Sequence, residues 1–511
     1  MIVLPDGHDY PEKFTRVVPF PAHPSEFPSL LPQPPGLVEE SWPPAQLTYL
    51  GVYLGTMGCK TIVHESHYID KDYIEDLALF YGRSLRNYPN YCQRLHFFAD
   101  AITEEEWRAY NSQTGDKRAE TEKRLQKSYL GFSVIRPLPG SPVGRTVLRT
   151  FGPTTKDAKR REFGAIRKYR VHIGGFSLAV WGLAFQQQDR GVSACATTAL
   201  WCALQKVAPM EEVGVVSPAA ITESASKYLL AGGRALPSEG LTIHQVCEAT
   251  RAAGLSPLVI RSVAPEHERA QLLGYLSSGF APVLALQPLT AEDGHAVCCV
   301  GLKLGAITPP SDPNEHFCDG QNAVHGLYIH DDRLGPYASA ELFPHTLSVG
   351  GVPRIVTGVK ILWPDGVLSH TAILAAIVVP VPTKLRLTIT RMRQLGIPVA
   401  SAVGQLLPQF DRIVTLSCYF KLGVTYLRES PEFGLSSDSL YSLTSETVLS
   451  RYVGVIALTV AGEPLLDILL DATESGINPA VLACVQRKTL PDKDSKILEF
   501  IASKLATRFL R

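Results

Sequence analysis

The spacing of apolar and polar residues changes repeatedly along the chain and predicts mixed helix and strand structure. Between Tyr73 and Leu85, apolar and aromatic residues recur at helical spacing. The charged stretch TEEEWRAYNSQTGDKRAETEKRLQKSY then predicts a solvated helix or a pair of helices. The next stretch, YLGFSVIRPLPGSPVGRTVL, predicts two short strands around a Pro-Gly turn. Residues 48–165 are therefore expected to form an α+β region.

The two ends of the chain have different patterns. Residues 1–47 contain FPAHPSEFPSLLPQPPG, and proline fixes φ and removes a backbone donor, so an extended arm on the body of the protein is predicted there. A proline motif that binds a partner is the alternative. In residues 366–511, HTAILAAIVVPVPTKLRLTITRMRQLG predicts a strand and a helix, and RYVGVIALTVAGEPLLDILLDAT predicts strands around a turn. This last region is also expected to be α+β.

Composition excludes several classes of protein. Lys+Arg 49 and Asp+Glu 49 cancel, which argues against a nucleic-acid partner. The most apolar run, Ala372 to Pro382, is too short to span a bilayer, and the N-terminus lacks the pattern of a signal peptide. Ten cysteines without any CxxC pair indicate buried thiols in a reducing compartment. We therefore expect a cytoplasmic protein that does not bind membranes.

In one segment, a run of polar residues comes directly before a predicted helix that is apolar on nearly all faces. In FQQQDRGVSACATTALWCALQKV, polar and turn-forming residues run up to Ser193, and the residues after Cys195 are apolar on nearly all helical faces. A helix that is apolar all round is buried. Cys195 would therefore stand at the N-terminus of a buried helix, where free N–H groups and the helix dipole stabilise a thiolate. A small core residue is the other interpretation of this cysteine.

Two later segments place polar residues at the ends of buried strands. In GFAPVLALQPLTAEDGHAVCCVGLKLG, His295 follows a glycine and leads directly into an apolar run. In HGLYIHDDRLGPYA, an apolar strand from Gly326 to Ile329 comes before His330, Asp331 and Asp332. A carboxylate at the end of a strand beside the histidine strand would bond the imidazole and fix its tautomer. A structural histidine and turn-capping aspartates are the alternative interpretation.

These three segments, in this order, resemble the papain-like cysteine peptidases, and most closely the bacteriocin-leader-processing (double-glycine) branch. The intervening stretches SEGLTIHQVCEATRAAGLSPLVI and LLGYLSSGFAPVLALQ resemble the segments that join the cysteine helix to the histidine strand in that family. The resemblance implies an α+β fold with a papain-like core, a buried helix packed on an antiparallel sheet, over residues 166–365. The N- and C-terminal regions would be α+β elaborations, for which no family is recognised.

The resemblance also implies a role for each residue of a triad. Cys195 matches the nucleophile, and His295 matches the general base that forms a thiolate–imidazolium pair and later protonates the leaving amine. Asp331 matches the orienting third member, with Asp332 as the neighbouring candidate. The implied activity is hydrolysis of a peptide or isopeptide bond through a thioester.

The resemblance is less complete at the oxyanion hole. The family uses a glutamine shortly before the cysteine, and Gln188 is the best match, with Gln187 second. The usual position, six residues before the cysteine, holds Asp189, and the residue after the cysteine is Ala196 in place of glycine. These departures affect the oxyanion hole and leave the nucleophile, the base and its partner in place.

Three other clusters of polar residues are expected to be structural. The HESH segment at 64–67 lacks the HExxH spacing of a metalloprotease, and the HFCD segment at 316–319 fits a polar loop. Arg136, Arg145 and Arg149 are expected to lie on a solvated or ion-paired face. No metal or cofactor is therefore predicted.

Three functions remain open from the sequence. The first is a cysteine peptidase acting on a peptide or protein substrate. The second is a thiol acyltransferase or amidase, since the same triad serves both. The third is a non-catalytic scaffold of the same fold that binds a protein partner through the flanking regions.

Overall fold

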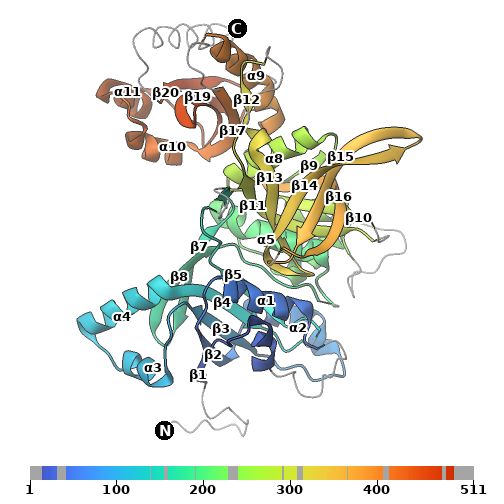
Figure 1. Cartoon of the computed structure of the whole chain (residues 1–511), viewed down its shortest axis with the longest axis vertical. Coiled ribbons are helices and arrows are strands. Elements are labelled where there is room, and N and C mark those ends of the chain that lie inside the picture. The colour runs from blue at the N-terminus through green and yellow to red at the C-terminus, as the bar shows by residue number, and fades with distance from the viewer. Residues whose placement is uncertain are drawn as a thin grey trace.

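The chain forms a mixed α+β structure in which most strands are antiparallel, so the α+β class predicted from the sequence is confirmed. The computed structural model describes residues 14–31, 42–138, 140–154, 159–189, 191–227, 240–289, 293–307, 315–364, 366–406, 414–474 and 479–487. Three sheets follow one another along the long axis of the molecule, with the first at the N-terminal end and the third at the C-terminal end (Figure 1).

The first sheet has five strands in chain order. They are β1 (Thr15–Pro19), β2 (Thr61–Tyr68), β3 (Cys92–Phe98), β4 (Tyr129–Ile135) and β5 (Val143–Leu148). Its helices are η1 (Pro24–Leu30), α1 (Ala45–Thr56), α2 (Lys71–Leu79), η2 (Tyr81–Arg83), α3 (Glu104–Asn111) and α4 (Gly115–Ser128). The charged segment is indeed a helix pair, and α3 begins with a capping box between Thr103 and Glu106. The predicted strands around the Pro-Gly turn are β4 and β5.

Residues 14–31 differ from the predicted arm. β1 pairs with β2 as an edge strand of the first sheet, and η1 packs against α1. Phe27 of η1 is fully buried. A Cβ at Gly51 would lie 2.3 Å from the carbonyl oxygen of Pro24, so this glycine permits the close approach of η1 to α1. The apolar residues between the prolines therefore bury this segment, and residues 1–13 and 32–41 of the predicted arm lie outside the described residues.

The central sheet closes on itself. Its strands are β6 (Arg160–Glu162), β9 (Ser256–Arg261), β10 (Val283–Pro288), β11 (His295–Leu304), β13 (Val324–Asp331), β14 (Gly335–Val349), β15 (Val352–Leu362) and β16 (Leu368–Val381). β16 pairs with both β15 and β10, so β10, β11, β13, β14, β15 and β16 form a closed antiparallel ring. β14 and β15 extend from the ring as a long hairpin (Figure 1), whose turn uses Gly350 and Gly351 at positive φ.

The buried helix that the sequence predicts lies against this ring. α5 (Cys195–Met210) begins at Cys195 and contacts β10, β11, β13 and β16. It also contacts α6 (Pro218–Ala225) and α7 (Ile243–Ala252), and Trp201 in its middle is fully buried. The apolar residues on every face of α5 therefore all find partners.

The sheets divide the chain at different residues from the predicted domain limits of 166 and 365. The hairpin of β7 (Arg167–Ile173) and β8 (Phe176–Gly182) packs against α4, β4 and β5 of the first sheet. At the other limit, β16 completes the central ring and extends it to Val381. Contacts between segments that are distant in the sequence decide where each sheet begins and ends. The local pattern of apolar and polar residues does not predict such contacts.

The third sheet contains β12 (Cys318–Asp319), β17 (Val414–Leu422), β18 (Tyr452–Val460), β19 (Glu463–Asp471) and β20 (Val481–Gln486). Its helices are η3 (Gly320–Ala323), α9 (Ile389–Leu406), α10 (Gly423–Glu429), η5 (Ser430–Phe433), α11 (Ser437–Tyr441) and the π-helical turn η6 (Ser442–Glu446). α8 (Pro265–Ser277) contacts β11 and β15 as well as β17, and so joins the central and third sheets. Among the described helices, none is long and apolar enough to cross a lipid bilayer.

Candidate active site

The register of two central strands brings the predicted histidine beside the predicted aspartate. β11 and β13 are antiparallel, with Cys298 opposite His330. Asp331 is the last residue of β13 and therefore lies near the start of β11, whose first residue is His295. Both side chains are fully buried. The end of one strand and the start of its neighbour meet at the same edge of the sheet.

The His295 ring is held by Asp331 through one nitrogen. Nε2 of His295 donates to Oδ1 of Asp331 at 2.9 Å, and Nδ1 is buried without a regular hydrogen bond to the described residues. The thiol of Cys195 interacts with the His295 ring and is among the groups that raise the pKa of His295. Burial lowers the pKa of His295, but Asp331, Cys195 and Asp332 outweigh burial and raise it to about 10. This environment stabilises the imidazolium.

The two adjacent aspartates have different environments. Burial raises the pKa of Asp331, but the charge of His295 and its hydrogen bond outweigh burial, so the pKa of Asp331 is lowered. The backbone N–H of Arg333 also donates to Oδ1 of Asp331 at 2.9 Å. Asp332 lies farther away, with Oδ1 at 3.9 Å from Nε2 of His295, and burial raises its pKa to about 7. Asp331 is therefore the carboxylate that is hydrogen-bonded to the imidazole.

Cys195 occupies the first position of α5. The preceding residue, Ala194, is extended and has no side-chain capping bond, and the Cys195 side chain is half-buried. Among the described residues, none accepts a hydrogen bond from the backbone N–H of Cys195. Free N–H groups at a helix start attract negative charge, so this position suits an oxyanion that forms beside Cys195.

A buried aspartate shapes the loop that leads to Cys195. Oδ1 of Asp189 accepts hydrogen bonds from the backbone N–H groups of Gly191, Val192 and Ser193 at 2.7, 2.6 and 3.2 Å. Oδ2 of Asp189 accepts from the hydroxyl of Ser193 at 2.9 Å. The aspartate at the position where the resemblance would place glutamine is therefore the internal anchor of this loop.

The first sheet holds this anchor in place. Arg136, which follows β4, is buried, and its Nη1 lies 3.8 Å from Oδ2 of Asp189. Its guanidinium also donates to the carbonyl oxygens of Ser141 and Gln187, at 2.8 and 2.9 Å from Nη2. A guanidinium with several fixed acceptors is a rigid support, so the first sheet helps to position the start of α5.

The glutamines before the cysteine have separate roles. Oε1 of Gln187 accepts from the backbone N–H of Val143, and its Nε2 donates to Gly140, so the second oxyanion candidate is engaged with the first sheet. Gln188, the first candidate, is half-buried, and no hydrogen bond joins its side chain to the described residues. Gln186 is buried, with no described partner for Nε2. The side-chain amide of Gln187 is therefore occupied by other hydrogen bonds, whereas that of Gln188 makes none to the described residues.

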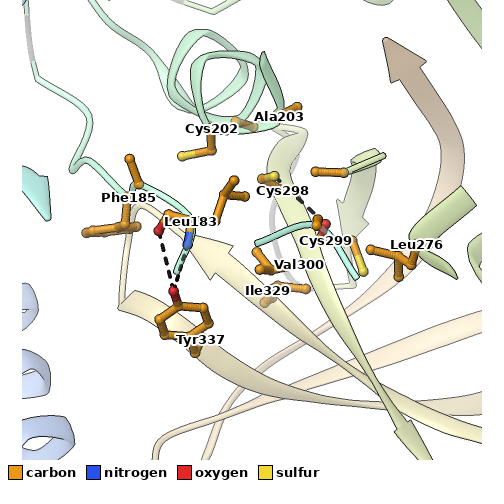
Figure 2. Close-up of a cluster of buried hydrophobic side chains, with 14 of the residues drawn as sticks. Leu183, Phe185, Cys202, Ala203, Leu276, Cys298, Cys299, Val300, Ile329 and Tyr337 are labelled. Carbon is orange, nitrogen blue, oxygen red and sulfur yellow. Dashed lines mark hydrogen bonds between the residues drawn. The ribbon is translucent and has the colours of Figure 1, made fainter. Parts of the chain in front are cut away.

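The other nine cysteines have a different environment. Burial raises the pKa of each of their thiols. Figure 2 shows Cys202 of α5 near Cys298 and Cys299 of β11, in a cluster of apolar side chains that includes Tyr337. Eight of the nine are buried, and Cys484 is half-buried. These thiols are core residues, as their apolar sequence context predicts.

A second histidine at the site was not predicted from the sequence. Nε2 of His370, in β16, lies 3.9 Å from Oδ2 of Asp331, and its ring centre is 5.9 Å from that of His295. Asp331 therefore lies between two imidazoles. The sequence contains one weak indication of this residue. His370, after Ser369, stands directly before an apolar run, as His295 does after Gly294.

The clusters expected to be structural have ordinary partners. Nδ1 of His64 accepts from Arg16 at 2.7 Å, and Nε2 bonds Gln93 at 2.8 Å. Arg145 pairs with Asp72 at 2.6 Å, which agrees with an ion-paired face.

No protein-family model matches the chain, and no curated protein matches it.

Proposed function

We propose that the protein is a cysteine peptidase of papain-like architecture that hydrolyses a peptide or isopeptide bond. One observation carries the proposal: the triad of Cys195, His295 and Asp331. A half-buried thiol at the start of a buried helix lies next to an imidazole whose far nitrogen is bonded to a buried carboxylate at 2.9 Å. A nucleophile, a base and a group that orients the base are the parts that covalent acyl transfer requires.

The first half of the proposed reaction forms a thioester. His295 takes the thiol proton on Nδ1, and the sulfur of Cys195 attacks the carbonyl carbon of the scissile bond. The carbon–nitrogen bond then breaks, and the imidazolium gives the same proton to the leaving amine. Asp331 keeps the other ring proton on Nε2 and stabilises the positive charge while the proton is held.

The second half restores the thiol. His295 removes a proton from water, the resulting hydroxide attacks the thioester carbon, and the carbon–sulfur bond breaks. The sulfur leaves as a thiolate and regains the proton from His295, so a carboxylic acid is released and the enzyme is unchanged. The backbone N–H of Cys195 and the amide of Gln188 are the proposed donors to the oxyanion in both halves.

The arrangement of α5 supports the papain-like part of the proposal. The helix that begins at the nucleophile packs on the closed antiparallel ring, and the base and its partner come from neighbouring strands of that ring. An acyl acceptor other than water would use the same residues, so acyl transfer to an amine is a variant of the same chemistry.

The rate of alkylation at individual cysteines tests the proposal. The full chain is treated with iodoacetamide at neutral pH, and each thiol is followed by peptide mass spectrometry. We expect Cys195 to react at least ~10-fold faster than half-buried Cys484, because a thiolate paired with an imidazolium is the reactive form. His295→Asn should remove this difference, whereas Cys484→Ala should leave the rate at Cys195 unchanged.

Equal alkylation rates at Cys195 and Cys484 in the native chain would overturn the proposal. The result would favour a non-catalytic scaffold that binds a protein partner. Incubation with a peptide library, with and without an added amine, then identifies the reaction by product mass. Cleavage products that contain the amine would show acyl transfer, and free carboxylic acids would show hydrolysis. Cys195→Ala is the control for both.

A further inference from the structure

A group of buried polar atoms without partners surrounds Asp331. Among the described residues, Oδ2 of Asp331, both carboxylate oxygens of Asp332 and Nε2 of His370 are buried and make no hydrogen bond. Asp331 is fully buried, and Asp332 is 3% exposed. Buried polar groups are nearly always paired, so such a concentration in one place indicates a site that takes a ligand.

The donor atoms around Asp331 are spaced for an ion. His295, Asp331 and His370 each offer one ligand atom, and these atoms lie within 4.8 Å of one another. The separation is 2.9 Å from Nε2 of His295 to Oδ1 of Asp331, and 3.9 Å from Nε2 of His370 to Oδ2. Ligands about 2.0–2.2 Å from a tetrahedral zinc ion are about 3.3–3.6 Å apart, so small rotations of the side chains suffice.

The chemical type of these donor atoms, and the strands that hold them in place, favour a transition metal. Imidazole nitrogens suit zinc, copper and nickel, whereas magnesium and calcium prefer oxygen ligands. Two imidazoles and one carboxylate form a known zinc ligand set that leaves a fourth position open. The three residues come from β11, β13 and β16 of the closed ring, so the backbone that carries them is fixed.

We propose that His295, Asp331 and His370 bind one divalent transition-metal ion of the zinc type, with the Asp332 carboxylate beside it, and that this ion switches the site off. The inhibitory effect rests on the proposed function, and the binding itself does not. The ion replaces the proton on Nε2 of His295, and that proton is released to solvent. A neutral imidazole with a metal on Nε2 carries its proton on Nδ1, so it cannot take the proton of Cys195.

Titration with zinc chloride tests the site. Chelator-treated full chain is titrated in competition with a chromophoric zinc indicator. We expect one zinc ion per chain, and weakening of at least ~10-fold in His370→Asn, since loss of even an outer-shell partner costs this much. His345→Asn, which changes a histidine on the β14–β15 hairpin, is the matched control and should bind as the native chain does. Thermal unfolding of each variant checks that it is folded.

Two further results separate this proposal from the peptidase. Cys195→Ala should still bind one zinc ion, because its sulfur is not a ligand. Zinc should slow alkylation of Cys195 in the native chain by about 10-fold or more and should not change the rate measured in His370→Asn. Native affinity in His370→Asn, or loss of zinc binding in Cys195→Ala, would overturn the proposed ligands. Zinc binding together with an unreactive Cys195 would leave the metal site standing and refute the peptidase.

Discussion

Replacement of Asp189 by alanine is expected both to slow the reaction of Cys195 and to lower the stability of the protein. The substitution removes the acceptor for three backbone N–H groups and for the Ser193 hydroxyl, all in the loop that leads into α5. It also removes the carboxylate that lies 3.8 Å from the buried guanidinium of Arg136. The three N–H groups and the hydroxyl would be left without this acceptor, and the guanidinium would be left without this opposite charge.

The size of the effect follows from these contacts. Removal of one partner of a buried ion pair costs about 3–5 kcal/mol, and each unpaired buried donor adds about 1–3 kcal/mol unless the loop moves. Movement of the loop is the cheaper outcome, so we expect a loss of about 3–5 kcal/mol in the free energy of unfolding. A displacement of about 1 Å at the start of α5 would lower the rate at Cys195 by about 100-fold. Asp189→Asn keeps one acceptor oxygen for the loop but loses the charge that faces Arg136, so it should be less destabilising than Asp189→Ala.

Urea unfolding and iodoacetamide alkylation together provide the assay. The matched control is Asp471→Ala, because Oδ1 of Asp471 makes the same kind of loop bond to the backbone and hydroxyl of Thr473, at 2.8 and 2.7 Å, in the third sheet. The control should lose stability without slowing Cys195. A folded Asp189→Ala chain that alkylates Cys195 at the native rate, or a control that slows equally, would refute the role given to Asp189.

Three further predictions concern other contacts. Asp331→Asn should slow alkylation of Cys195 by about 100-fold or more, because the amide no longer stabilises the imidazolium; an unchanged rate would contradict the triad. Gly191→Ala should lower the free energy of unfolding by about 1–3 kcal/mol, since the new Cβ would lie 2.5 Å from the Phe80 ring; equal urea midpoints would contradict this. Burial lowers the pKa of His96 to about 4, so its contribution to stability is present above pH ~6.5 and is lost as the pH falls. Between about pH 7.5 and 5 the native chain should therefore lose about 2 kcal/mol more than His96→Gln, and equal losses in urea unfolding would refute this.

The pattern of the sequence was sufficient wherever a structural feature is local. The switch from polar residues to a wholly apolar helix located the start of α5 at Cys195, and the apolar runs located the strands that begin at His295 and end at Asp331. The helix pair and the strands around the Pro-Gly turn were predictable for the same reason. Helical and strand periodicity depend on neighbours a few residues apart.

The features that the sequence did not predict depend on contacts between residues that are far apart in the chain. The proline-rich segment supplies β1 because β2 offers an open edge, and the central domain extends to Val381 because β16 closes the ring. The choice of Asp331 over Asp332 depends on which side chain points at His295, and the role of Asp189 depends on a loop held by Arg136 from another sheet.

The sequence by itself determined which residues begin and end the elements of the site, and so which side chains were candidates for chemistry. Only the tertiary structure decided how these candidates combine. It placed His370 beside Asp331 and committed Gln187 to the first sheet. The physical reason is that hydrogen bonds and charges act over a few ångströms in space, whereas the residues they join here lie dozens of positions apart in the chain.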